Sequence, residues 1–140
     1  MEIVVVNLSI RSLIGISPQS EFDLAEIVEQ GIPTDSLAYL RHQGLTFTEV
    51  SSIVISPRTL KHRRARGEKL SNEETERAIR VGRVLSQAEL VFGSHDKALL
   101  WLRTPDDRLN DRTPLSMLHT EAGGRLVESM LWQIDDGVYT

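Results

Sequence analysis

Six lysine, arginine and histidine residues fall within nine positions of the stretch SPRTLKHRRAR, from Arg58 to Arg66. Such a density of cations and hydrogen-bond donors suits contact with a polyanion, and DNA is a polyanion whose major groove admits a helix. The chain as a whole has a net charge of −4, so the basic cluster is a local feature. An ordinary solvated helix face is the alternative that charge alone leaves open.

The charge is also segregated along the chain. Residues 1–36 carry one Arg against six acids, a net charge of −5, and residues 37–104 carry 12 Lys and Arg against seven acids, a net charge of +5. Residues 105–140 carry three Arg against seven acids, a net charge of −4. This pattern predicts that the middle of the chain meets a polyanion and that an end meets a basic protein surface.

Residues that could do catalytic chemistry are not arranged for it. The sequence has no Cys, no GxGxxG and no P-loop, and its four histidines are scattered without metal-ligand spacing. Ser94, His95 and Asp96 are adjacent at a helix start, where their side chains diverge, so we interpret Ser94 as a helix cap. Gly123 and Gly124 suit close packing better than phosphate binding. We therefore expect no enzyme activity, no metal and no cofactor.

The elements that must position the basic cluster are helices. Residues 46–54 and SPRTLKHRRARG predict two short helices joined at residues 55–57, with Gly67 as the stop, which is the spacing of a helix-turn-helix. Upstream, one helix is predicted from the cap Ser17 and Pro18 to Gly31, and another from Pro33 to Gly44. The only strand candidate is IVVV at positions 3–6.

A long helix is predicted to follow, from Ser71 to about Phe92. Ser71 and Glu74 have the spacing of a capping box. Apolar residues recur at intervals of three and four, which is typical of a packed helix: Ala78, Val81, Leu85, Ala88 and Phe92. A short helix over 94–104, a loop over 104–114, a helical turn over 114–119 and a last helix ending at Gly137 complete an all-α fold.

The second helix of the pair would lie in the DNA major groove. Ser56 would cap it, Pro57 would occupy its first position and Leu60 would point toward Val50 and Ile53. Arg66 and Lys69 suit phosphate contacts or solubility. The DNA-binding candidates are Arg58, Thr59, Lys61, Arg63 and Arg64.

Several short segments agree, in order, with one known family. The segments are TLKHRRARGEKLSNEETERAIRVGRVLSQAELVFG, KALLWL and TPLSMLHTEAGGRLVESMLWQIDDGVY. From about residue 44 to residue 140, the chain resembles the Xre-type antitoxins that carry the MbcA/ParS/Xre toxin-binding domain. The resemblance implies an Xre-like helix-turn-helix that binds the operator of its own operon, followed by a small helical domain that neutralises a toxin, typically one with a RES domain that consumes NAD.

The resemblance also implies where the toxin binds. ISPRTLKHRR matches the recognition helix of the family, Trp101 in ALLWL is implied to be structural, and the C-terminus is implied to enter the active-site cleft of the toxin. A cleft that binds the NAD pyrophosphate must be cationic, and the acidic C-terminal end could occlude it. The toxin-binding candidates are Arg125, Glu128, Trp132, Asp135, Gly137, Val138, Tyr139 and Thr140.

The predicted organisation is an N-terminal helical region, 1–70, with the helix-turn-helix at about 46–67, and a toxin-binding domain, 71–140. The absence of Cys and of an export signal predicts a cytoplasmic protein without a membrane partner. We expect operator DNA and a cognate RES-domain toxin as partners, with an antitoxin homodimer inside a heteromeric complex. A stand-alone helix-turn-helix regulator with a C-terminal dimerisation domain, and a small adaptor protein, remain the alternatives.

Overall fold

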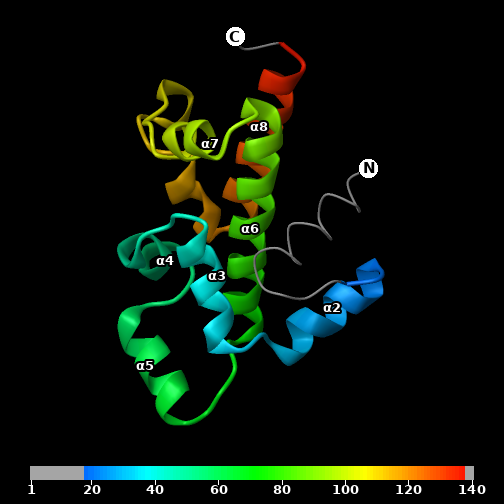
Figure 1. Cartoon of the computed structure of the whole chain (residues 1–140), viewed down its shortest axis with the longest axis vertical. Coiled ribbons are helices and arrows are strands. Elements are labelled where there is room, and N and C mark those ends of the chain that lie inside the picture. The colour runs from blue at the N-terminus through cyan, green and yellow to red at the C-terminus, as the bar shows by residue number, and fades with distance from the viewer. Residues whose placement is uncertain (1–17, 138–140) are drawn as a thin grey trace.

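The computed structural model describes residues 18–137, and every regular element in that range is helical (Figure 1). The all-α prediction is therefore confirmed, while the strand candidate at 3–6 lies outside the described residues. No helix of residues 18–137 is long and apolar enough to cross a lipid bilayer. The α-helices are α2 (Glu21–Gln30), α3 (Leu37–His42), α4 (Phe47–Ile53), α5 (Pro57–Ala65), α6 (Asn72–Phe92), α7 (His95–Leu102) and α8 (Glu121–Asp135).

Local capping signals fix most helix starts where the sequence places them. Ser71 and Glu74 form the predicted capping box of α6, and Gly93 ends that helix in a left-handed conformation. The predicted start of the first helix at Ser17 and Pro18 is wrong. Ser20 caps α2 instead, because its hydroxyl accepts a hydrogen bond from the Asp23 amide (3.1 Å) while its own backbone stays extended.

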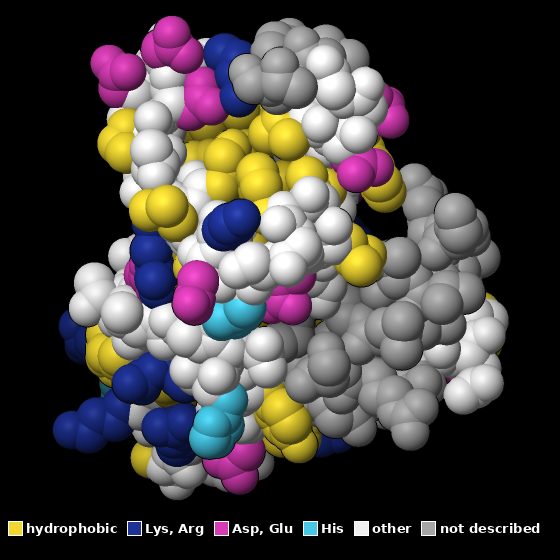
Figure 2. Space-filling view, turned by 45° about the horizontal axis from the view of Figure 1, so that its top comes forward, with side chains coloured by type: hydrophobic (Ala, Val, Ile, Leu, Met, Phe, Trp, Pro, Cys, Tyr) yellow, Lys and Arg dark blue, Asp and Glu magenta, His cyan; other side chains and the backbone are white. Residues whose placement is uncertain are grey.

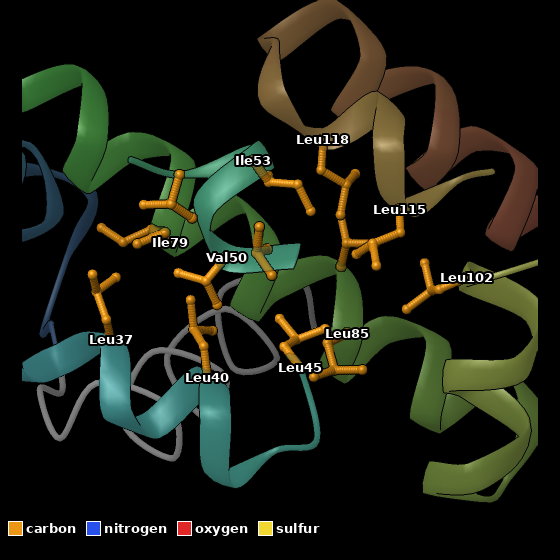
Figure 3. Close-up of a cluster of buried hydrophobic side chains, with 14 of the residues drawn as sticks. Leu37, Leu40, Leu45, Val50, Ile53, Ile79, Leu85, Leu102, Leu115 and Leu118 are labelled. Atoms are coloured by element: carbon orange, nitrogen blue, oxygen red, sulfur yellow. The ribbon is translucent and has the colours of Figure 1, made fainter. Parts of the chain in front are cut away.

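Helix α6 is the central element of the molecule. It packs against α2, α7 and α8, and α3 and the short 3-10 helix Leu115–His119 also contact it (Figure 1). The predicted apolar seam is confirmed for Ala78, Val81, Leu85 and Ala88, which are buried, whereas Phe92 is half-buried against Trp101. Figure 3 shows side chains from α3, α4, the segment between them, α6, α7 and the Leu115–His119 turn converging on one core: Leu37, Leu40, Leu45, Val50, Ile53, Ile79, Leu85, Leu102, Leu115 and Leu118.

Polar side chains spaced three residues apart on α6 also bond to the rest of the molecule. These bonds reach the turn after α4, the end of the Leu115–His119 turn and α8. Arg77 Nε donates to the Val54 carbonyl (2.9 Å), Arg80 Nη1 to the Leu118 carbonyl (3.1 Å) and Arg83 Nε to the Glu128 carboxylate (2.7 Å). One face of α6 therefore holds both the helix pair and α8.

The double glycine of α8 is a close-packing site, as predicted. A Cβ at Gly123 would overlap the carbonyl oxygen of Met117, and a Cβ at Gly124 would lie 2.6 Å from Cδ of Arg80. Larger residues there would push α8 away from α6 and from the preceding turn.

Candidate functional site

The helix pair α4–α5 has the predicted turn between its members. The Ser56 hydroxyl accepts from the Thr59 amide (3.2 Å) and caps α5, with Pro57 at the first helical position. Leu60 is buried in the same core as Val50 and Ile53, as expected. α5 is therefore anchored along one side, which leaves its other sides available to a partner.

The five DNA-binding candidates differ in how they are presented. Arg58, Lys61 and Arg64 are exposed and make no ion pair within the described residues. Thr59 is half-buried, and its hydroxyl accepts a hydrogen bond from Ser56 Oγ (2.9 Å). Arg63 is engaged: its Nε and Nη2 donate to the two carboxylate oxygens of Glu74 at 2.9 and 3.2 Å.

Further basic side chains, from α3, lie near Arg64 of α5. Arg41, His42 and Arg64 line a surface hollow between α3 and α5, and the Arg41 guanidinium stands 5.8 Å from the centre of the Phe47 ring. Figure 2 shows Lys and Arg side chains gathered in the lower part of the molecule, where α5 lies in Figure 1. The hollow has an apolar floor and a basic rim.

The described toxin-binding candidates lie on α8 and just after it. Its buried side carries Val127, Met130 and Leu131, so its other side faces outward. Arg125 and Asp135 are exposed, Trp132 is 42% exposed and Glu128 is half-buried by its ion pair with Arg83. Gly137 follows the helix in a left-handed conformation (φ 79°), and Val138, Tyr139 and Thr140 lie outside the described residues.

Exposed apolar side chains also occur on α6 and α7. Leu90 of α6 and Leu100 of α7 are exposed by 67% and 68%. Figure 2 shows a hydrophobic patch in the upper part of the molecule, where α7 and the ends of α6 and α8 lie in Figure 1. Trp101 is half-buried, and its ring centre lies 5.7 Å from that of Phe92, which agrees with its implied structural role. Figure 1 shows α5 and the C-terminal end of α8 at opposite ends of the long axis of the molecule.

Two ion pairs that the sequence did not reveal tie the helix pair to the rest of the molecule. One joins Arg63 to Glu74; in the other, Arg103 Nε and Nη2 donate to the carboxylate of Glu49, both at 2.8 Å. The Arg103 hydrogen bond holds the pKa of Glu49 below its ordinary value. The sequence predicts the capping box of Ser71 and Glu74, and Glu49 forms a second capping box with Thr46. No local sequence pattern predicts which arginines pair with these two glutamates.

Two family models cover most of the chain. The model described as "Antitoxin Xre-like helix-turn-helix domain" matches residues 23–83, and the model described as "Antitoxin Xre/MbcA/ParS C-terminal toxin-binding domain" matches residues 87–137. The first contains α4 and α5, and the second contains α7 and α8. The DNA-binding candidates thus fall inside the first match, and the toxin-binding candidates up to Gly137 fall inside the second.

Relatives and a solved structure agree with these matches. The chain is 35% identical over 118 residues to "Antitoxin Xre" of Pseudomonas putida, covering 84% of this chain and 74% of the relative. It is 30% identical to "Antitoxin Xre" of Photorhabdus laumondii, covering 89% and 86%. A chain of the "M.tuberculosis MbcT-MbcA toxin-antitoxin complex" has a TM-score of 0.54 and 27% identity, with 76% of this chain and 95% of that chain covered. This chain therefore belongs to the Xre family of antitoxins, with a helix-turn-helix domain followed by a toxin-binding domain.

Proposed function

We infer that this antitoxin neutralises a cognate RES-domain toxin that degrades NAD, by covering the active site of the toxin with α8 and the tail. The observation that carries this proposal is the outward side of α8, which ends in an exposed tryptophan followed by two carboxylates, within the residues that match a toxin-binding domain. A large exposed aromatic side chain is typical of an interface anchor. Asp135 and Asp136 complement a cationic cleft that binds pyrophosphate.

The second half of the proposal is repression of the antitoxin's own operon. Support comes from the family match over the helix-turn-helix and from the exposed cations of α5, flanked by Arg41 and His42 of α3. Half-site recognition by a homodimer would suit this type of helix pair. Because α5 and the C-terminal end of α8 lie at opposite ends of the molecule, one antitoxin that uses them in this way could hold both partners together (Figure 1).

Neutralisation is tested with the purified cognate toxin and an assay of NAD loss. The full-length antitoxin should stop NAD loss, whereas a chain ending at Asp136 should do so only at a much higher concentration, about 10-fold or more, if the tail enters the cleft. Trp132→Ala should weaken neutralisation by a similar factor. Phe22→Ala is the matched control, because Phe22 is also an exposed aromatic (71%) but lies on α2.

The outcomes separate the candidate functions. Full neutralisation by the truncated chain and by Trp132→Ala would contradict the proposed occlusion. Binding of operator DNA without any effect on NAD loss would favour the stand-alone regulator.

A further inference from the structure

Arg63 differs from the other cations predicted to contact DNA. Its guanidinium makes two parallel hydrogen bonds with the carboxylate of Glu74, at 2.9 and 3.2 Å, and its side chain is 26% exposed. Glu68 lies near the same guanidinium, 3.8 Å from Nη1. Such a two-point contact fixes the plane of the guanidinium as well as its distance. Arg63 therefore already has a carboxylate partner within the protein.

Glu74 is in turn held by its own helix. The Ser71 amide donates to Glu74 Oε1 (2.7 Å) and the Ser71 hydroxyl accepts from the Glu74 amide (3.1 Å). Burial acts to raise the pKa of Glu74, but the hydrogen bonds from Arg63 and Ser71 outweigh burial and hold it below its ordinary value. The carboxylate is thus charged at neutral pH and oriented by the first turn of α6.

Moving Arg63 to a DNA phosphate would be unfavourable. The Glu74 side chain is only 8% exposed, so loss of its cation would leave a buried carboxylate with no opposite charge, stabilised only by the hydrogen bond from the Ser71 amide. Arg77, one turn further along α6, donates to the Val54 carbonyl at the turn between α4 and α5 (2.9 Å). α6 therefore holds the helix pair at two points, its turn and the C-terminal half of α5.

We propose that Arg63 is a positioning residue: through Glu74 it sets the angle of α5 against α6, so that Arg58, Lys61 and Arg64 face the DNA together. The inference rests on the proposed DNA-binding function. It replaces the expectation of a direct DNA contact at Arg63 with an indirect role, and it makes the first turn of α6 part of the DNA-reading apparatus.

The substitution Glu74→Gln distinguishes a direct DNA contact of Arg63 from a positioning role, because the two predict opposite changes in DNA affinity. Glutamine also serves the third position of a capping box, so the start of α6 is kept while the ion pair is lost. If Arg63 contacted a DNA phosphate, the Glu74 carboxylate would compete with that phosphate for Arg63. Its removal would then strengthen DNA binding. If Arg63 positions α5, affinity should fall, by about 3- to 30-fold, although the protein has become less acidic. Glu73→Gln is the matched control, since it removes the same charge from an exposed neighbour.

The measurement is fluorescence anisotropy of a labelled duplex from the region upstream of the coding sequence, with a random-sequence duplex beside it. Circular dichroism checks that each variant is folded. Arg63→Lys gives a second test, because lysine keeps the charge for a phosphate but lacks the two-point fork, so positioning predicts weaker binding. Glu74→Gln and Arg63→Lys binding as tightly as the wild type would overturn the inference and leave the proposed function intact. A wild type that binds neither duplex would overturn both.

Discussion

At the scale of single residues, Gly123 is a position where the fold has no room for a side chain. A Cβ there would overlap the backbone oxygen of Met117, which cannot move without displacing the whole turn before α8. We expect Gly123→Ala to lower the free energy of unfolding by about 2–4 kcal/mol, despite the higher helix propensity of alanine. Urea denaturation followed by circular dichroism measures this loss.

Gly67→Ala is the control for this prediction. Gly67 has a positive φ of 65°, but a Cβ at this position would meet no other atom within 4 Å, so only the cost of the left-handed conformation, about 1 kcal/mol, should appear. Equal losses at Gly67 and Gly123 would show that α8 does not pack as closely as the structure has it.

The ion pair between Glu49 and Arg103 should make stability depend on pH. Its hydrogen bonds hold the pKa of folded Glu49 below the ordinary 4.5, so the unfolded chain binds more protons in the acid range. This contribution is fully present above about pH 4.5 and is lost as the pH falls through the folded pKa. Urea midpoints measured between about pH 6 and pH 3 should therefore fall further in the wild type than in Glu49→Gln. Parallel pH profiles would contradict the assignment.

At the scale of elements, α5 should carry most of the salt dependence of DNA binding. Each phosphate contact that is removed lowers the slope of log affinity against log salt concentration by about 0.9. Replacing Arg58, Lys61 and Arg64 together by alanine should thus reduce the slope by about 2–3. Titrations of the operator duplex at several salt concentrations give the slope.

A matched control for that prediction is Arg125→Ala. Arg125 is an exposed arginine of α8, outside the helix pair, where the same change of charge should leave the slope nearly unchanged. An equal effect of Arg125→Ala and of a single substitution on α5 would mean that overall charge, and not contact by α5, sets the affinity.

The sequence predicts elements better than it predicts contacts between them. Caps and stops are local, so Thr46, Ser56, Ser71, Ser94 and Gly93 mark helix ends in the structure. The start of the first helix was misplaced at Ser17 because the following Pro18 resembles a proline at the first helical position. Only the structure shows that Ser20 caps the helix.

The candidate site was predictable in outline but not in detail. Exposure of Arg58, Lys61 and Arg64 follows from polar residues around Leu60 on one helix. The engagement of Arg63 does not, because Glu74 lies 11 residues away and meets it only when α5 folds back toward α6. The pairing of Glu49 with Arg103 spans 54 residues and depends on the whole fold.

At the scale of the molecule, both candidate surfaces rest on one core. A boundary near residue 70 between the two domains remains a prediction from the sequence. The buried cluster nevertheless runs continuously from Ile32 before α3, through α4 and α6, to Leu131 of α8. α6 contacts both candidate regions: Arg77 donates a hydrogen bond to the turn of the helix pair, and Arg83 donates one to α8.

We therefore expect residues 18–137 to unfold as one cooperative unit. Trp101 and Trp132 lie in α7 and α8, whereas the helix pair contains no tryptophan. Val50→Ala, which opens the core at α4, should still shift the tryptophan-monitored urea midpoint, by an amount corresponding to roughly 2 kcal/mol. The transition followed by circular dichroism should shift with it and coincide with it.

The matched control in α4 is Thr48→Ala, which changes an exposed side chain of the same helix and should leave both transitions in place. If the helix pair were an independent unit, Val50→Ala would split the circular dichroism transition and leave the fluorescence midpoint unchanged. A single shared transition would instead mean that a mutation in the core beneath the helix pair proposed to bind DNA also destabilises α8, which is proposed to bind the toxin. Loss of one function through a core substitution would then be accompanied by loss of the other, whereas surface substitutions on α5 and α8 would separate them.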